Sequence, residues 1–229
     1  MKITEDLNPK IEKLIMSTFD LTVDKLPSIN EIKPFVHVSD FDMVSSFPSD
    51  SFKIRDKYLE NCFIVYTDEF LIALKKFCDA KQFTIVNELC CGTGWFSHWM
   101  RKYDIPLITA TDNKTWGKYK ANNKFLPIVK KEDAVKFVNK TPETDMYILS
   151  WPYMDPLARM IWDAMRPGQY LLYIGEDWGG CTADESFFQA IEGSEVEDKD
   201  FLEVENNFVQ FWGLHDRPVL LRKTLKITE

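Results

Sequence analysis

The sequence predicts an α/β fold in which a mostly parallel sheet, ending in an antiparallel C-terminal hairpin, carries helices on both faces. From residue 83 onward, short apolar runs alternate with amphipathic stretches, which is typical of parallel strands joined by helices. The 229 residues are 45% hydrophobic and 28% charged, which suits one large domain with an appendage. We therefore expect a core domain over 81–229 and a mostly helical N-terminal extension or lid over 1–80.

Two helices are expected in the extension. Residues 9–18 place three apolar side chains on one helical face. Residues 66–79 (YTDEFLIALKKFCD) repeat apolar side chains at helical spacing, and Thr67 or Asp68 can cap the first turn.

The core is expected to begin with five parallel strands, at 83–89, 107–112, 125–130, 145–151 and 169–176. Pro127 weakens the third of these. Two further apolar runs are expected to pair as the antiparallel hairpin, at 207–212 and 217–225. Helices are expected between the strands, at 95–103, 132–138, 156–165 and 185–191. Pro156 suits the first turn of a helix.

Composition argues against several classes of protein. No apolar run approaches the roughly 18 residues that a transmembrane helix needs, and the N-terminus lacks the apolar core of a signal peptide. We therefore expect a cytoplasmic protein without a membrane partner. The five cysteines are an odd number, contain no CxxC pair and have no histidine at ligand spacing. This pattern argues against a disulfide framework and against a zinc site, so no metal is expected.

Charge is distributed unevenly along the chain. The net charge of −8 argues against a generic polyanion binder, although residues 101–140 carry +6 and residues 176–216 carry −11. We favour two solvated faces of opposite sign. The alternative is a basic rim beside a cleft with an acidic lip opposite, which would suit a cationic or amine-bearing substrate better than nucleic acid.

The candidate site residues follow the predicted strands, because ligands of such sheets bind at the carboxyl ends of the strands. They are Glu88 with the loop to Gly94 (ELCCGTG), Asp112 with Asn113, Asp133, the segment Ser150-Trp151-Pro152-Tyr153, and Glu176.

Each of these residue types has a physical use at a strand end. Gly92 and Gly94 let a ligand approach the backbone, and Glu88 can hold the loop amides or a ligand ammonium. Asp112 has two oxygens spaced for a ribose diol. Asp133 opens a helix, where it can cap the helix or accept a hydrogen bond from an adenine amino group.

This order of residues resembles that of the class I S-adenosylmethionine-dependent methyltransferases, over residues 83–225. The resemblance implies a Rossmann-like sheet and S-adenosylmethionine as cofactor. It implies that the methionine part is held by the loop after the first strand, the ribose by the acid after the second and the adenine by the acid after the third. The implied residues are Glu88, Cys90, Gly92 and Gly94, then Asp112 with Asn113, then Asp133 with Ala134. Cys90 departs from the family, which usually has glycine there.

The sequence also resembles a group of uncharacterised methyltransferase-like proteins. The shared segments are FIVYTDE (63–69), GTGWFS, LSWPYMDPLARM, YIGEDWGGCTADESFF and FWGLHDRPVLLRK. The group typically has a WPP-Tyr segment, then an Ile-Gly-Glu plus Gly-Gly-Cys-Thr segment, then a Gly-x-His-Asp segment. The second proline of the first of these is absent here. This resemblance adds Tyr66 and Thr67 to the expected cofactor contacts.

The acceptor side is expected at Ser150-Trp151-Pro152-Tyr153. Ser150 stands where amine-methylating relatives carry Asn or Asp, and its hydroxyl is a weaker hydrogen-bond partner than a carboxylate. Trp151 and Tyr153 would form an aromatic wall that suits a flat or cationic acceptor. Glu176 would act as a general base, as an ammonium anchor or as a cap of its own loop. The pair His215-Asp216 is interpreted as structural rather than catalytic.

The expected function is therefore methyl transfer to a small molecule or to a polar or amine group. Two alternatives stay open: a catalytically silent S-adenosylmethionine-binding protein with a regulatory or interaction role, and a nucleic-acid methyltransferase. The basic segment favours the latter and the total charge opposes it.

Overall fold

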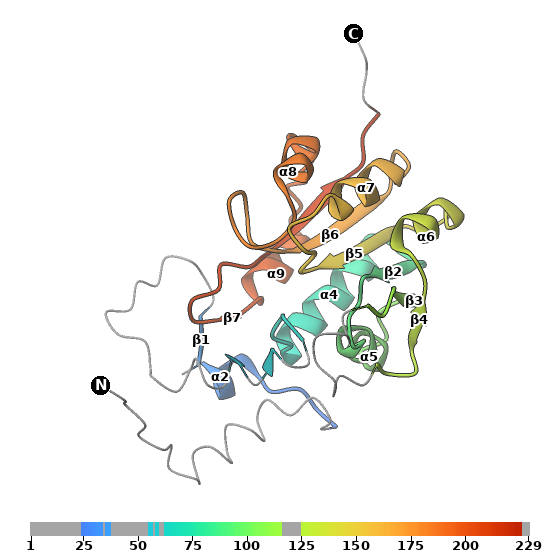
Figure 1. Ribbon diagram of the computed structural model, residues 1–229. Coiled ribbons are helices and arrows are strands. Elements are labelled where there is room, and N and C mark those ends of the chain that lie inside the picture. Colours follow the sequence, from blue (N-terminus) through green and yellow to red (C-terminus); the bar gives the residue numbers. More distant parts are fainter. Residues whose placement is uncertain are drawn as a thin grey trace.

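The computed structural model describes residues 24–33, 35–37, 55–56, 58–59, 62–115 and 125–225 (Figure 1). The helix expected at 9–18 lies outside these residues. The described helices are α2 (Ile29–Ile32), α4 (Asp68–Ala80), α5 (Trp95–Lys102), α6 (Ala134–Lys140), α7 (Leu157–Ala164), α8 (Glu185–Ile191) and α9 (Phe201–Asn206). The described strands are β1 (Val36–His37), β2 (Val86–Leu89), β3 (Leu107–Asp112), β4 (Val129–Lys131), β5 (Met146–Ser150), β6 (Tyr170–Gly175), β7 (Gln210–Phe211) and β8 (Arg217–Arg222).

The main sheet has six strands in the order β4-β3-β2-β5-β6-β8. Each neighbouring pair from β4 to β6 is parallel, and β8 runs antiparallel to β6 along its whole length. The predicted fold class, a Rossmann-like and mostly parallel sheet with an antiparallel C-terminal end and helices on both faces, is confirmed. The chain winds outward in one direction from β2 through β3 to β4, and in the other from β5 to β6. The point where the direction reverses therefore lies between β2 and β5, where such sheets leave a crevice for a ligand.

The antiparallel end of the sheet is formed by β6 and β8, so the expected pairing of 207–212 with 217–225 is wrong. Residues 210–211 instead form β7, which pairs with β1 in a separate two-stranded sheet, with Val36 opposite Phe211. The third parallel strand also begins later than expected, at Val129. Its N–H donates to the carbonyl of Leu126 in a turn, so the residues around Pro127 are not extended.

Two layers of helices cover the sheet. Helices α4, α5 and α9 pack on one face, where Met146 and Ile148 of β5 point, and α6, α7 and α8 pack on the other, where Tyr147 and Leu149 point (Figure 1). This division follows from the alternation of side chains along a strand. All four of these strand residues are fully buried, which is why β5 reads as a continuous apolar run.

Helices α4, α6 and α8 begin where a short polar side chain satisfies one of their first N–H groups. Thr67 accepts a hydrogen bond from the N–H of Phe70 at 3.2 Å and so caps α4, as expected. Asp133 accepts one from the N–H of Lys136 at 2.9 Å and caps α6. Helix α9 was not expected, because its sequence FLEVEN is short and acidic.

No described helix is both long and apolar enough to span a membrane. The described residues also contain no cluster of three or more histidine, cysteine or acidic side chains that could hold a metal ion.

Candidate functional site

A cavity of about 250 Å³ opens at the carboxyl ends of β2, β3, β4 and β5. It therefore lies at the reversal point of the sheet, as expected for a ligand site. All but three of the fifteen predicted site residues line it. Those that do are Tyr66, Glu88, Cys90, Gly92, Asp112, Asn113, Asp133, Ala134, Ser150, Trp151, Pro152 and Tyr153.

Thr67, Gly94 and Glu176 do not line this cavity. Thr67 is fully buried beneath it as the cap of α4. Glu176 follows β6, which lies beyond β5 from the reversal point, and lines a second cavity instead. Its carboxylate accepts a hydrogen bond from the N–H of Cys181, so it caps its own loop, which was one of the three expected roles.

Gly94 sets how closely the start of α5 lies to β4. It caps α5 with a φ of +91°, and a Cβ at this position would lie 2.4 Å from Cγ2 of Val129 in β4. Only glycine lets the start of α5 approach β4 this closely. Gly92 serves a different purpose: its φ is +55°, a Cβ there would meet nothing within 4 Å, and its N–H donates to Asp112 at 3.1 Å.

The loop after β2 also contains a strained residue. Cys90 has a φ of +52°, in the left-handed region that favours glycine. A glycine at this position would take this backbone conformation without the strain that a Cβ brings. Burial raises the pKa of the Cys90 thiol to about 12, with smaller contributions from the surrounding carboxylates, so this cysteine is a packed and unreactive group.

Glu88 is a buried carboxyl at the floor of the cavity. Only 2% of its surface is exposed, and the hydroxyl of Ser97 on α5 donates to its Oε2. Burial raises its pKa from 4.5 to about 8; the hydrogen bond from Ser97 acts against this rise, and the nearby Asp112 adds to it.

Asp112 is held in place by the backbone. Its two oxygens accept hydrogen bonds from the N–H groups of Gly92 and Lys114, at 3.1 and 2.5 Å. Burial raises the pKa of this carboxyl, and the two N–H groups act against the rise. The side chain is therefore fixed at the end of β3, with its carboxylate at the cavity.

The charge of the cavity wall is one-sided. Five carboxyl side chains line it, from Glu88, Asp112, Glu132, Asp133 and Asp155. No lysine or arginine side chain of the described residues lines it. Such a wall favours a ligand with positive charge and hydrogen-bond donors, and it disfavours phosphate.

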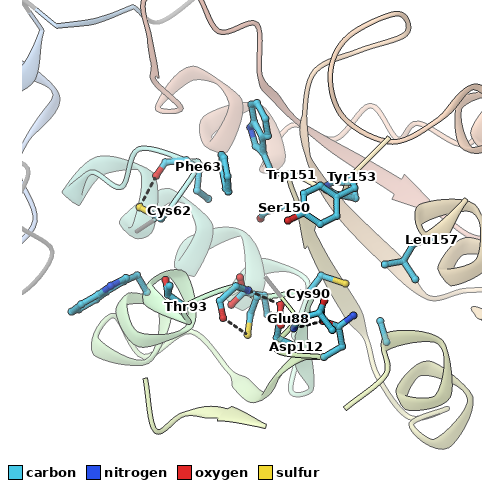
Figure 2. A pocket seen from close by; sticks show the side chains of 18 of the residues that line it. Cys62, Phe63, Glu88, Cys90, Thr93, Asp112, Ser150, Trp151, Tyr153 and Leu157 are labelled. Atoms are coloured by element: carbon cyan, nitrogen blue, oxygen red, sulfur yellow. Dashed lines mark hydrogen bonds between the residues drawn. The ribbon is translucent and has the colours of Figure 1, made fainter. Parts of the chain in front are cut away.

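Aromatic side chains form the other half of the cavity. Phe63 and Trp151 are stacked with ring centroids 5.0 Å apart, and Figure 2 shows them with Tyr153 on the side opposite Glu88 and Asp112. The indole N–H of Trp151 donates to Oδ2 of Asp216 at 2.8 Å, which explains the structural role expected of the pair His215-Asp216. Trp151 has a φ of +49°, in the left-handed region. The backbone therefore takes the same type of conformation directly after β5 as it does at Cys90 directly after β2.

Ser150 ends β5 between the two halves (Figure 2). Its hydroxyl oxygen is inaccessible to solvent and has no hydrogen-bond partner within the described chain. A buried polar atom without a partner is uncommon and points to a ligand group or water that completes it.

The sequence did not indicate several residues of the cavity wall. Cys62 and Phe63 come from the segment before α4, and no short-range pattern signals their place. Asp155 could have been found, because it is an acid in the same post-strand loop as Ser150. Glu132 could likewise have been found beside Asp133.

The chain is similar in structure to solved methyltransferases. Human N-acetylserotonin methyltransferase in complex with SAM is 19% identical with a TM-score of 0.40, over 67% of this chain and 51% of that chain. A SAM-dependent methyltransferase from Archaeoglobus fulgidus is 14% identical with a TM-score of 0.39, over 69% and 95%. TehB from Haemophilus influenzae is 14% identical with a TM-score of 0.41, over 76% and 66%.

No protein-family model matches the sequence, and no curated protein matches it. The matched part of this chain spans about half the length of the human N-acetylserotonin methyltransferase. At this identity the likeness concerns the fold, and the assignment of a function depends on the residues of the cavity.

Proposed function

We propose that this protein binds S-adenosylmethionine in the acid-lined cavity and transfers its methyl group to a small molecule or to a polar or amine group. The observation that carries the proposal is the set of strand-end carboxylates that meet in one cavity, whose wall contains no lysine or arginine from the described part of the chain. S-adenosylmethionine has a sulfonium, an ammonium, a ribose diol and an adenine amino group, which are cationic or hydrogen-bond donors. A dinucleotide or nucleoside triphosphate would bring phosphates to the same wall.

The residues present fit this ligand. The Asp112 carboxylate is oriented by two backbone N–H groups and keeps lone pairs for a diol, because each carboxylate oxygen can accept two hydrogen bonds. One oxygen of Asp133 caps α6, and its carboxylate still lines the cavity beside Ala134. Glu88 is the partner for the ammonium, which would favour the ionised form of this buried carboxyl.

Bound S-adenosylmethionine supplies an activated methyl group, and its transfer to a nucleophile's lone pair breaks the carbon–sulfur bond and leaves a neutral thioether. The protein's part in such a reaction is to position the acceptor and exclude water. Phe63, Trp151 and Tyr153 would confine the acceptor, and the Ser150 hydroxyl would hold its polar group.

Calorimetry tests the cofactor assignment. S-adenosylmethionine and S-adenosylhomocysteine are expected to bind, while NAD⁺ and ATP at the same concentrations are not. Asp112→Asn should weaken binding by roughly 1–3 kcal/mol, about five- to 150-fold, because a diol loses its charged acceptor. Asp79→Asn is the matched control, since Asp79 is an exposed residue of α4 paired with Lys75. Equal affinities for the two variants, or no binding of either adenosyl ligand at millimolar concentration, would contradict the proposal.

A catalytically silent binding protein is the second candidate, and Ser150 is the observation that favours it. A hydroxyl there cannot draw a proton from an acceptor as a carboxylate does. Incubation with methyl-labelled cofactor and an extract of host metabolites and macromolecules separates the two. Label in a small-molecule fraction supports transfer, whereas tight cofactor binding without any labelled product supports the silent protein. Label in nucleic acid would support the nucleic-acid alternative, which the acidic wall disfavours.

A further inference from the structure

We propose that the acceptor is a small arylalkylamine, whose ring lies in the aromatic half of the cavity and whose aliphatic nitrogen lies toward Ser150 and Asp155. This inference rests on the proposed function for the reaction, but the binding of such an amine is tested separately below. It is drawn from three features of the cavity: its ring-lined wall, the Asp155 carboxylate, and the Ser150 hydroxyl, which has no partner among the described residues.

The ring-lined wall is built from two distant parts of the chain. Phe63 precedes α4 and Trp151 follows β5, yet their rings are stacked at 5.0 Å with an interplanar angle of 15°. Tyr153 lines the same cavity with 55% of its surface exposed, so it lies at the mouth. Faces and edges of aromatic rings bind other flat rings and cations better than they bind an aliphatic body of equal size.

The wall is held in one orientation by a hydrogen bond outside the cavity. Oδ2 of Asp216 accepts from the indole N–H of Trp151 at 2.8 Å, and Asp216 is 97% buried, with only 3% exposed. The bond leaves the Trp151 ring face, rather than its polar edge, as the part that packs with Phe63. The polar edge of the indole is thus engaged by Asp216, and the two stacked side chains offer an acceptor their remaining apolar ring surface.

The carboxylates supply the preference for a cation. The proposed cofactor engages Glu88, Asp112 and Asp133, and Glu132 is paired with Nζ of Lys140 at 2.7 Å. The carboxylate that is left for an acceptor is that of Asp155. Asp155 lies in the same loop as Trp151 and Tyr153, and its Oδ1 accepts the N–H of Leu157 at 2.9 Å, so its position is fixed at the start of α7. A carboxylate fixed beside an aromatic wall selects a protonated amine over a neutral or acidic analogue of the same shape. The bound ammonium must give one proton to this carboxylate before the nitrogen lone pair can attack the methyl group and break its bond to sulfur.

The Ser150 hydroxyl supplies the contact with the nitrogen. It is buried, has no partner within the described chain and lies between the aromatic and acidic halves (Figure 2). A hydroxyl can accept a hydrogen bond from an N–H group and still donate another. An amine nitrogen would therefore supply the hydrogen-bond partner that this hydroxyl lacks among the described residues.

Three probes of matched size test the inference by calorimetry, each titrated into the protein with and without saturating S-adenosylhomocysteine. 2-Phenylethylamine carries the ring and the charge, 2-cyclohexylethylamine the charge alone, and phenylacetate the ring with the opposite charge. We expect 2-phenylethylamine to bind at least tenfold more tightly than either analogue. Ser150→Ala should weaken its binding three- to thirtyfold. Ser186→Ala, at a half-buried position of α8 that does not line this cavity, should leave it unchanged.

The outcomes separate this inference from the proposed function. If S-adenosylhomocysteine binds and the three probes bind equally or not at all, the acceptor class is wrong while the cofactor assignment stands. If 2-phenylethylamine binds selectively but the adenosyl ligand does not, the pocket chemistry stands and methyl transfer is wrong. If nothing binds, both are wrong. An unchanged affinity in Ser150→Ala would exclude Ser150 from contact with the amine.

Discussion

The raised pKa of Glu88 makes the stability of the unliganded protein depend on pH. The carboxyl has a pKa near 4.5 when solvated and about 8 in the fold, so the folded state holds its proton more tightly than the unfolded chain does. The contribution of the group to stability is therefore fully present below about pH 4.5 and is lost as the pH rises through 8. Fully developed, the loss amounts to as much as ~5 kcal/mol, at roughly 1.4 kcal/mol for each factor of ten.

Glu88→Gln is the perturbation that isolates this effect, because glutamine has the shape of the protonated side chain and does not ionise. At pH 5 the two proteins should have nearly the same free energy of unfolding. Above pH 8 the variant should be the more stable by several kcal/mol, since the native protein must then hide a charge. Urea unfolding between pH 5 and 8.5 measures the difference. Glu203→Gln, at an exposed position of α9, is the control for a general change in charge.

A difference between native and Glu88→Gln stabilities that stays constant over this range would refute the reasoning.

A ligand ammonium provides a second measurement of the raised pKa of Glu88. If it pairs with Glu88, ligand binding near neutral pH should release protons, measured as a dependence of the binding enthalpy on the ionisation enthalpy of the buffer. Glu88→Gln should abolish that release.

Three further predictions concern backbone and packing. Gly94→Ala should lower the free energy of unfolding by about 2 kcal/mol or more, because its Cβ would overlap Val129. Gly92→Ala is the control, since its φ is also positive but the space around it is open, and a comparison of the two variants by thermal unfolding isolates the cost of the overlap. Cys90→Gly should be more stable than Cys90→Ala by about 1 kcal/mol, reversing the usual order, because φ is positive there; equal melting temperatures would contradict this. Asp216→Ala should cost about 1–3 kcal/mol of stability and Asp216→Asn much less, because the amide still accepts from the indole. Adding Trp151→Phe to Asp216→Ala should give a non-additive cycle, and additivity would mean that the two side chains are not coupled.

The sequence predicts the sheet well because its signals are local. Each parallel strand is a short apolar run, and the acids after β2 and β3 mark strand ends directly. Since carboxyl ends of parallel strands share one edge of a sheet, placing Glu88, Asp112, Asp133 and Ser150 together required only the order of elements. The capping role of Thr67 was predictable because its signal is local as well: a threonine stands directly before the apolar repeat of α4.

What the sequence could not supply depends on contacts between distant segments. Glu176 follows a strand like the others, but its distance from the reversal point is a property of strand order and not of its neighbours in sequence. The pairing of β7 with β1 joins residues that lie more than a hundred positions apart, and the hydrophobic pattern of β7 fits either partner. Phe63 lines the cavity in a stacked contact with Trp151, a residue far from it in the sequence.

The contacts Asp216–Trp151–Phe63 tie one end of the cavity to three separate stretches of the chain. Acceptor preference would therefore not be modular. Grafting the loop around Ser150 alone into another scaffold would transplant the indole without the carboxylate that orients it or the ring that covers it. A successful chimera would have to carry all three stretches together, and a library meant to diversify the acceptor should randomise Phe63 and Trp151 jointly while leaving Asp216 fixed.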